Sequence, residues 1–236
     1  MPENRRFVIG DIHGCYRTFR TMVEKIIRLE KGDTLFLLGD YIDRGQSSRE
    51  VIDYILQLKN ESYTVKPVMG NHEFMLLRSL EDPEFFRLWI VNGCAATLLS
   101  FGADPEKVHD RESVFKIPDL YIRFFSELPL YEETEDFLIV HAGVPPGISD
   151  IKDHPETVLW TRDETINEKI LGNRRLVHGH TPVPKEMIRE RIGDPKAKTF
   201  NLDAGCVYNR FPSLGNLAAL NMDSLQLFHL ENIDLY

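Results

Sequence analysis

The sequence has little of what membrane or disulfide-stabilised proteins contain. Its three cysteines, Cys15, Cys94 and Cys206, are far apart and include no Cys-x-x-Cys pair, so we expect neither a disulfide framework nor a thiolate zinc site. No apolar run approaches the roughly 18 residues that would span a bilayer, and the start of the chain has no apolar segment after its charges. We therefore expect a protein of the reducing cytoplasm with no membrane partner.

Positively charged residues are outnumbered by negatively charged ones. The 236 residues contain 28 lysines and arginines against 37 aspartates and glutamates, for a formal net charge of -9. Such a chain repels polyanions, so we expect no general binding to a nucleic-acid backbone. Small or exposed phosphate groups stay compatible with this charge.

Two sequence patterns of phosphate chemistry are missing. No cysteine is followed six positions later by arginine, which excludes the loop of a phosphocysteine mechanism, and no Gly-Lys-Ser/Thr supports a nucleotide-binding phosphate loop. Any phosphate chemistry must therefore use other groups.

The first third of the chain alternates strand and helix patterns. Residues 6–9, 34–38 and 63–69 are short apolar strands, residues 16–30 have helical spacing, and Ser47 is expected to cap a second helix. This alternation predicts an α/β core, in which functional groups collect at the carboxyl ends of the strands.

The rest of the chain predicts a cap and a second sheet. Residues 74–127 are mostly helical, residues 137–140 and 176–177 return to strands, and the last quarter, including 200–202, is expected to form short antiparallel strands. We expect a single α/β domain over residues 1–236, a mixed two-sheet β-sandwich in α-β-β-α layers, with a cap-like helical insertion at about 74–127.

Metal-binding residue types recur just after the strands. The chain contains Gly-Asp-Ile-His at 10–13, Gly-Asp-Tyr-Ile-Asp-Arg-Gly at 39–45, Gly-Asn-His-Glu at 70–73, His-Ala-Gly at 141–143 and His-Gly-His at 178–180. Carboxylate oxygen and neutral imidazole suit manganese, iron or zinc, and this number of ligands can hold two ions. We expect two divalent ions, with manganese as the first choice, and phosphoester hydrolysis as their chemistry.

The chemistry of a dinuclear centre assigns roles to these residues. Asp40 is expected to bridge the ions, because one anionic ligand must be shared. The six expected ligands divide into Asp11, His13 and Asp40 for one ion and Asp40, Asn71, His141 and His180 for the other. A hydroxide that bridges the ions would attack phosphorus directly.

The leaving oxygen needs a proton and the phosphoryl group needs a counter-charge. His72 is the expected general acid, with Asp43 orienting it. Arg44 and Arg162 are expected to bind the phosphoryl oxygens of the substrate, since a guanidinium fork matches phosphate.

Each motif has an alternative interpretation when it is taken singly. Aspartate caps helices, histidine packs in cores, and Arg44 or Arg162 could form a structural salt bridge. His178 should point away from His180, so we assign it to packing or to support of a ligand. The acidic run 132–136 is expected to be a hairpin turn.

The five motifs, in this order, resemble those of the calcineurin-like metallophosphoesterases, specifically the phosphoprotein phosphatase family. The resemblance spans most of the chain and implies the ligand, acid and arginine roles given above. Trp160-Thr161-Arg162 and the compact length resemble bacterial and phage serine/threonine phosphatases. The resemblance thus implies a substrate that is a phosphorylated protein or a small phosphoester.

Some residues depart from the family pattern. Met69 stands where many protein phosphatases have arginine, and Tyr208-Asn209-Arg210-Phe211-Pro212 is an unusual stretch. Symmetrical diadenosine tetraphosphate hydrolases, the alternative, tend to have Gly-Asn-His-Asp and lack Asp-Arg-Gly, so Glu73 and residues 43–45 favour a monoesterase. An inactive metal-binding scaffold is a third interpretation. The sequence predicts neither the oligomeric state nor regulatory partners.

Overall fold

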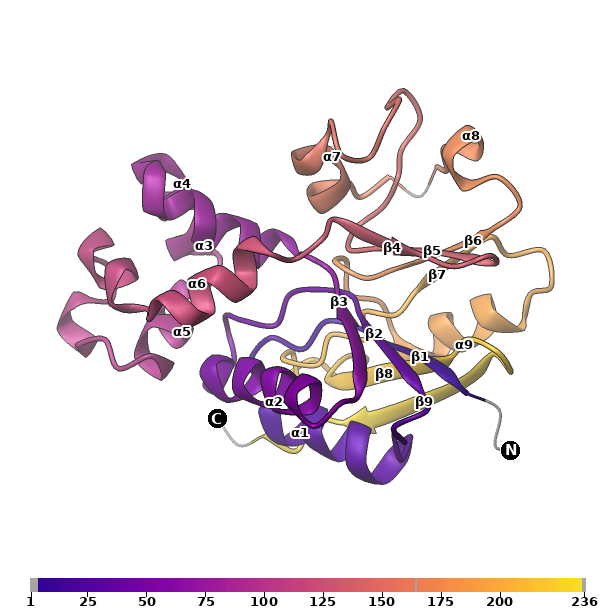
Figure 1. Ribbon diagram of the computed structural model, residues 1–236, viewed down its shortest axis with the longest axis horizontal. Helices are drawn as coiled ribbons and strands as arrows, with labels where there is room; N and C mark the ends of the chain where they lie inside the picture. The colour runs from indigo at the N-terminus through magenta and orange to yellow at the C-terminus, as the bar shows by residue number, and fades with distance from the viewer. Residues whose placement is uncertain (1–3, 164, 235–236) are drawn as a thin grey trace.

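Two mixed β-sheets form the centre of the computed structural model, which describes residues 4–163 and 165–234 (Figure 1). The first sheet has the order β3 (Thr64–Pro67), β2 (Thr34–Leu37), β1 (Arg6–Ile9), β8 (Asn216–Asn221), β9 (Gln226–Glu231). The second has the order β4 (Tyr131–Glu133), β5 (Phe137–Val140), β6 (Arg175–His178), β7 (Thr199–Asn201). Two sheets flanked by helices confirm the predicted fold class.

Parallel pairing brings the motif-bearing strand ends together. Strands β1, β2 and β3 are parallel to one another, and so are β5, β6 and β7. The carboxyl ends of each set therefore lie at one edge of their sheet. The prediction of an antiparallel strand at 200–202 was wrong in direction, because the crossover through α9 (Lys185–Gly193) returns the chain parallel to β6. The antiparallel prediction is correct for β8 and β9.

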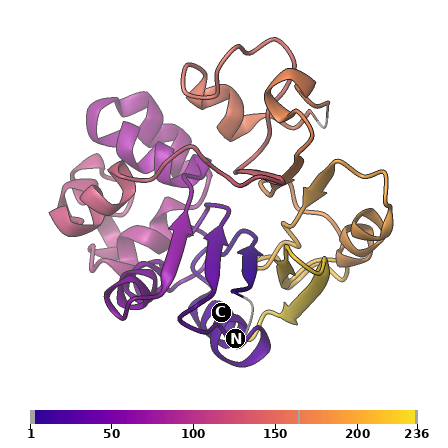
Figure 2. The ribbon, with the colours of Figure 1, turned by 45° about the vertical axis from the view of Figure 1, so that its right-hand side comes forward.

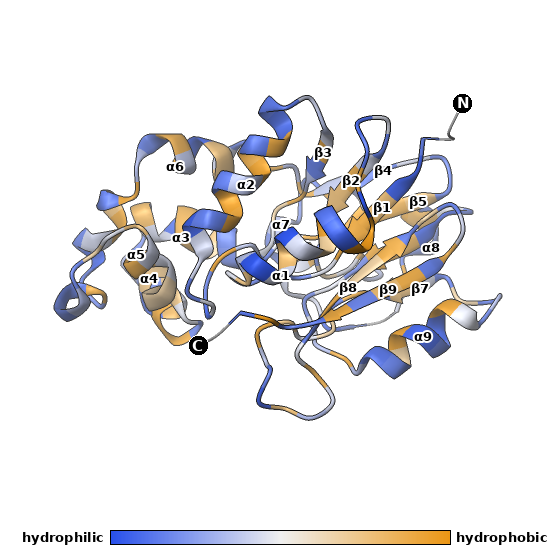
Figure 3. Ribbon diagram, turned by 90° about the horizontal axis from the view of Figure 1, so that it is seen from below, coloured by the Kyte–Doolittle hydropathy of each residue, from blue (hydrophilic) through white to orange (hydrophobic). Residues whose placement is uncertain are grey.

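Alternation along the strands builds two cores. Phe7 and Ile9 face the helices and join the larger cluster of buried side chains. Val8 and Phe36 point to the opposite face and pack with Phe137 of the second sheet. Because successive side chains of a strand point to opposite faces, strands that are apolar throughout can be buried on both sides. Figure 3 shows mainly hydrophobic residues along β2 and β8, whereas α9 carries both hydrophilic and hydrophobic residues.

Helices cover both sheets and one flank. They are α1 (Tyr16–Thr21), α2 (Ser48–Asn60), α3 (Asn71–Glu81), α4 (Pro83–Val91), α5 (Cys94–Ser100), α6 (Asp119–Ser126), α7 (Pro155–Trp160), α8 (Glu168–Leu171) and α9. A π-helical segment at Met22–Ile26 follows α1, and 3-10 turns lie at Pro105–Lys107 and Arg111–Lys116. No helix among the described residues is long and apolar enough to cross a membrane.

Two local helix predictions need correction. The helix expected over residues 16–30 is α1 continued by the π-helical segment, and it ends at Ile26. Ser47 does occupy the N-cap position of α2, but its side chain makes no capping hydrogen bond. Ser48 instead contributes to the second motif loop, because its Oγ accepts the amide hydrogen of Asp43 at 3.1 Å. The hairpin turn predicted at 132–136 is shorter than expected: Glu132 and Glu133 belong to β4, and residues 134–136 make the turn to the antiparallel strand β5.

The helices between residues 71 and 126 gather on the side of β3. Figures 1 and 2 show this group apart from the C-terminal strands β8 and β9. Helix α3 contacts α4 and α6, and α5 contacts α2. The helical content agrees with the expected insertion, and its status as a cap on a single domain stays a prediction.

We expect Asp33→Asn to destabilise the fold by about 2 kcal/mol, the scale of hydrogen bonds to a charged group. Asp33 is buried; its Oδ2 accepts from Arg5 Nη2 at 2.6 Å and its Oδ1 from the Arg5 amide at 3.0 Å. Burial raises the pKa of Asp33, but these bonds outweigh burial and lower it below its ordinary value. This stabilisation is present above the ordinary carboxyl pKa, about 4, and is lost as the pH falls through the lowered value.

Urea unfolding at pH 7 and at pH 3 measures this effect. The difference between wild type and Asp33→Asn should shrink at pH 3. Glu81→Gln is the matched control, because Glu81 is 78% exposed and lies 3.7 Å from Arg78; it should change stability by less than about 0.5 kcal/mol. An equal loss in both variants would contradict the role of Asp33.

Candidate metal centre

The predicted ligand loops meet where the carboxyl edges of the two sheets face each other. Several of their residues have left-handed backbones, with φ of 46° at His13, 50° at Asp40, 73° at Asp43, 69° at Arg44 and 72° at His180. Such conformations are uncommon for residues other than glycine and tend to gather at functional sites. The loops therefore hold these side chains in backbone conformations that only the surrounding structure can enforce.

Glycines in the motifs allow carboxylates to approach the backbone. A Cβ atom on Gly70 would lie 2.3 Å from Asp40 Oδ1, and one on Gly179 would lie 2.0 Å from Asp11 Oδ1. Neither contact is tolerable, so any side chain at these positions would displace a carboxylate. This explains why glycine precedes Asn71 and why it separates His178 from His180.

Asp40 lies between two groups of donor atoms. His13 Nε2 lies 3.4 Å from Asp40 Oδ2, and His141 Nε2 lies 3.4 Å from Asp40 Oδ1. Asp40, His141 and His180 each offer a ligand atom within 4.8 Å of the others, as do His13, Asp40 and His72. Burial raises the pKa of Asp40, but the nearby histidines and Arg44 hold it below its ordinary range. Asp40 is thus a shared anion.

The imidazoles of His13 and His141 are oriented as metal ligands usually are. Nδ1 of His13 donates to the carbonyl of Ile42 at 2.8 Å, and Nδ1 of His141 donates to the carbonyl of Leu38 at 2.8 Å. A proton fixed on Nδ1 leaves Nε2 unprotonated, so that its lone pair can bind a metal ion beside Asp40. Burial lowers the pKa of both histidines, which favours the neutral form that a metal requires.

Other possible metal-ligand atoms at the centre either crowd one another or are buried without a hydrogen-bond partner. Asn71 Oδ1 lies 2.9 Å from His141 Nε2 and 3.0 Å from His180 Nδ1. Within the described part of the chain, Asp11 Oδ1 and His180 Nε2 are buried without a hydrogen-bond partner. Buried polar atoms are rarely left unsatisfied. The residues present therefore fit bound cations.

Asp11 lies at the margin of the centre. Its Oδ2 accepts the amide hydrogen of His180 at 3.0 Å, but it belongs to neither group of donor atoms. Burial and repulsion from Asp203 and Asp40 raise the pKa of Asp11 well above its ordinary value. A cation at the centre would relieve this repulsion, so the geometry is compatible with the predicted role.

His72 is held by a carboxylate. Its Nδ1 lies 2.5 Å from Asp43 Oδ2, and both residues are buried. Burial alone would lower the pKa of His72, but Asp40 and Asp43 raise it above the ordinary value. His72 thus differs from His13, His141 and His180, whose pKa values are lowered. His72 Nε2 lies 3.8 Å from Asp40 Oδ2. This distance is compatible with His72 as a general acid and with His72 as a metal ligand.

Two residues of the helical segment fix Asp43, and sequence patterns did not indicate them. Thr97 Oγ1 donates to Asp43 Oδ1 at 2.6 Å, and Trp89 Nε1 donates to Asp43 Oδ2 at 2.6 Å. Trp89 lies on α4 and Thr97 on α5, which carry no motif. The helical segment therefore supports the site and does not merely cover a sheet.

Glu73 also has a role that its motif did not reveal. Its Oε2 accepts from the amides of Asp40 at 2.9 Å and Gly70 at 3.0 Å, and its Oε1 accepts from the amide of Tyr41 at 2.8 Å. Burial raises the pKa of Glu73 to about 8. Glu73 therefore joins the second and third motif loops and does not face the donor atoms.

The two predicted arginines have different surroundings. Arg44 Nη1 donates to His13 Nε2, and its guanidinium lies over the ring of Tyr208, 5.5 Å from the centroid. Arg162 is exposed on the segment after α7, and its charge is among the causes that lower the pKa of His180. The structure thus brings Arg44 into the centre and leaves Arg162 at its rim.

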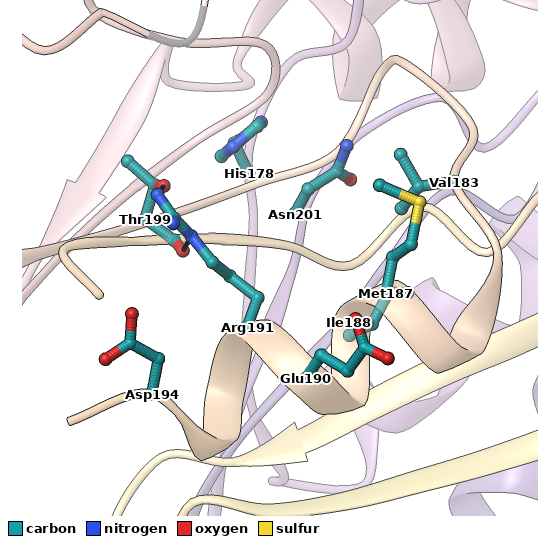
Figure 4. A pocket seen from close by; sticks show the side chains of 9 residues that line it. All are labelled: His178, Val183, Met187, Ile188, Glu190, Arg191, Asp194, Thr199 and Asn201. Carbon is teal, nitrogen blue, oxygen red and sulfur yellow. Dashed lines mark hydrogen bonds between the residues drawn. The ribbon is translucent and has the colours of Figure 1, made fainter. Parts of the chain in front are cut away.

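A cavity of about 350 Å³ lies apart from this centre, against α9 (Figure 4). Met187 and Arg191 line it from α9, and His178 and Asn201 from the ends of β6 and β7. None of the predicted metal ligands lines it. His178 lies apart from the donor atoms, as predicted, but alternation is not the reason, because residues two apart in a strand share a face. His178 ends β6, whereas His180 lies beyond the strand with a φ of 72°, and this left-handed turn separates the two side chains.

Comparisons with known proteins agree with this geometry. Residues 5–208 match the family model described as calcineurin-like phosphoesterase. A serine/threonine-protein phosphatase 2 of Salmonella typhimurium is 30% identical over 73% of this chain and 74% of its own. An asymmetrical bis(5'-nucleosyl)-tetraphosphatase of Anoxybacillus flavithermus is 27% identical over 93% of this chain and 91% of its own.

A solved structure has the same fold over the whole chain. A serine/threonine phosphatase from Saccharomyces cerevisiae aligns with 100% of this chain and 82% of its own, with a TM-score of 0.65 and 17% identity. That likeness concerns the fold alone. Together with the family match over residues 5–208, it shows that this chain belongs to the calcineurin-like phosphoesterases and is a metal-dependent phosphoester hydrolase.

Proposed function

We propose that this centre hydrolyses phosphoesters with two divalent ions held around Asp40. The supporting observation is that Asp40 is shared by two groups of donor atoms. The proposed ligands are those predicted from the sequence: Asp11, His13, Asp40, Asn71, His141 and His180. Manganese is the proposed metal, and the ligand types also suit iron or zinc.

The proposed mechanism uses the positions of the chain's own residues. When bound, the two ions lower the pKa of water and neutralise charge on the phosphoryl group. His72 donates a proton from Nε2 to the leaving oxygen as its bond to phosphorus breaks. Asp43 holds His72 in this orientation through Nδ1. No step needs a covalent intermediate on the protein.

Arg44 and Arg162 are proposed to bind the phosphoryl oxygens. Arg44 already lies at His13, where it donates to the lone pair that an ion would use. With His13 as a metal ligand, Arg44 would no longer donate to Nε2, and its guanidinium fork would be free for phosphate oxygens. Arg162, at the rim near His180, would approach the same group from the other sheet.

Phosphoserine and phosphothreonine proteins are the first substrate class that we propose. The motifs favour it, and the Salmonella relative carries that name. We also propose a cytoplasmic location, because the three cysteines are far apart and include no Cys-x-x-Cys pair.

Dinucleoside polyphosphates are the second substrate class. The Anoxybacillus relative, named for that activity, matches nearly the whole chain. Glu73 accepts hydrogen bonds from backbone amides of the motif loops. The difference between Gly-Asn-His-Glu here and Gly-Asn-His-Asp in the dinucleotide hydrolases therefore concerns the loop structure and does not argue against a dinucleotide substrate. Met69 also removes an arginine that many protein phosphatases have at that position.

Substrate hydrolysis by manganese-loaded and metal-stripped protein tests the proposal. The substrates are a phosphoserine/phosphothreonine peptide, a phosphotyrosine peptide and diadenosine tetraphosphate. We expect manganese-dependent hydrolysis and no phosphoenzyme after rapid acid quench. Phosphate release from the serine/threonine peptide would support the first class, and preferential dinucleotide cleavage the second. No turnover by the loaded protein, or a trapped phosphoenzyme, would overturn the mechanism.

A further inference from the structure

A hollow of about 270 Å³ opens beside Arg44. It is lined by Arg44 and by Val207, Tyr208, Asn209, Arg210 and Phe211. Arg44 reaches His13 on one side and the Tyr208 ring on the other. The hollow therefore adjoins the candidate metal centre through a single side chain.

The loop that forms the hollow is organised by its own backbone. Gly215 N donates to Gly205 O at 2.9 Å and closes the base of the loop, and Tyr208 N donates to Gly205 O at 2.8 Å. Phe211 N then donates to Tyr208 O at 3.0 Å, and Asn232 Nδ2 donates to the carbonyl of Cys206 at 2.9 Å. The loop is thus built to present its side chains, and it needs no ligand to order it.

The charged side chains of the hollow are both positive. Arg44 and Arg210 are the charged residues that line it. No residue within 4–163 or 165–234 forms an ion pair with Arg210. Arg44 also interacts with the carboxylates of the centre, since its charge partly offsets the burial that raises the pKa of Asp11 and Asp203, and it helps to lower the pKa of Asp40. Arg210 is therefore the arginine of the hollow whose charge most favours an anionic ligand, in a chain with a net charge of -9.

Aromatic rings accompany these charges. Tyr208 and Phe211 meet edge to face, with centroids 6.0 Å apart and planes at 79°. Phe211 is 57% exposed, so most of its ring is not used in packing. An exposed ring held by a neighbour offers a face on which a planar group can stack.

We propose that this hollow binds the nucleoside end of a nucleoside polyphosphate substrate. The phosphorus under attack would lie at the metal centre beside Arg44, a further phosphate would pair with Arg210, and the base would stack on Phe211. Water supplies the new oxygen on phosphorus, the bridging P–O bond breaks, and the leaving phosphate keeps the bonding electrons. The inference rests on the proposed phosphoesterase function and adds a binding subsite for the second substrate class.

Steady-state kinetics of Phe211→Ala, with diadenosine tetraphosphate and inorganic tripolyphosphate, test the inference. The ratio of the two kcat/KM values, dinucleotide over tripolyphosphate, should fall about 5- to 100-fold, the range for loss of one base stack. The matched control is Phe115→Ala, since Phe115 is 59% exposed and does not line the hollow. The control should leave the ratio unchanged. Arg210→Gln should lower both kcat/KM values about tenfold.

Calorimetry gives a second readout that does not depend on turnover. ADP should bind metal-stripped wild type and Phe115→Ala alike, and Phe211→Ala at least fivefold more weakly. Equal ADP binding and equal kinetic ratios in both variants would overturn the subsite, even if the phosphoesterase is active. An inactive metal-loaded protein that still binds ADP through Phe211 would refute the proposed function but not the subsite.

Discussion

Asp40→Asn is expected to lose both metal ions and to cause the largest fall in activity of any single substitution. Asp40 lies 3.4 Å from both His13 Nε2 and His141 Nε2, so its charge serves both groups. The loss should exceed the ~10²–10⁴-fold that removal of a general acid causes. Metal content after dialysis, measured by plasma emission spectrometry, checks the result.

The substitution is well suited to separate charge from folding. Asp40 has φ of 50°, a conformation that asparagine tolerates well, and the asparagine carbonyl can still accept from the His72 amide, now 3.1 Å from Asp40 Oδ1. Asp203→Asn is the control, because Asp203 is a buried carboxylate at the same edge that accepts from Gly205 N at 2.8 Å. It should retain two ions. Two tightly bound ions in Asp40→Asn would show that another group bridges them.

His72→Asn is expected to keep its metal ions and to lower kcat about 10²–10⁴-fold. The reason is that His72 holds a proton beside Asp43, whereas the imidazoles of His13 and His141 are arranged as neutral ligands. Rate measurements with substrates of different leaving-group pKa check the assignment. The loss should be smaller for a good leaving group such as p-nitrophenol, which needs no proton.

Thr97→Val provides a graded comparison for His72. It removes a hydroxyl that donates to Asp43 at 2.6 Å but leaves His72 in place. Its effect on kcat should be smaller than that of His72→Asn, on the order of 10- to 100-fold, as for other residues that orient a functional side chain. Loss of metal from His72→Asn would instead make His72 a ligand, in line with its distance from Asp40 Oδ2 of 3.8 Å.

Local sequence determined the strands and the residue types at their ends. The strand predicted at residues 6–9 is β1, and those predicted at 34–38 and 137–140 are β2 and β5. These predictions succeed because an apolar run followed by glycine and polar residues is a local signal for a strand and its turn. The family resemblance rested on the same motifs, and the match over residues 5–208 confirms it.

Contacts between distant residues were decided only by the tertiary structure. The direction of β7 depends on the crossover through α9, and the support of Asp43 comes from Trp89 and Thr97, about 50 residues further along the chain. The hollow beside Arg44 joins a loop after β2 to one before β8. None of these contacts has a periodic or motif signal, because each depends on how the two sheets and the helical segment pack. The sequence by itself thus determined which metal-binding residue types follow the strands, and packing decided which distant side chains, such as Trp89 and Thr97, support them.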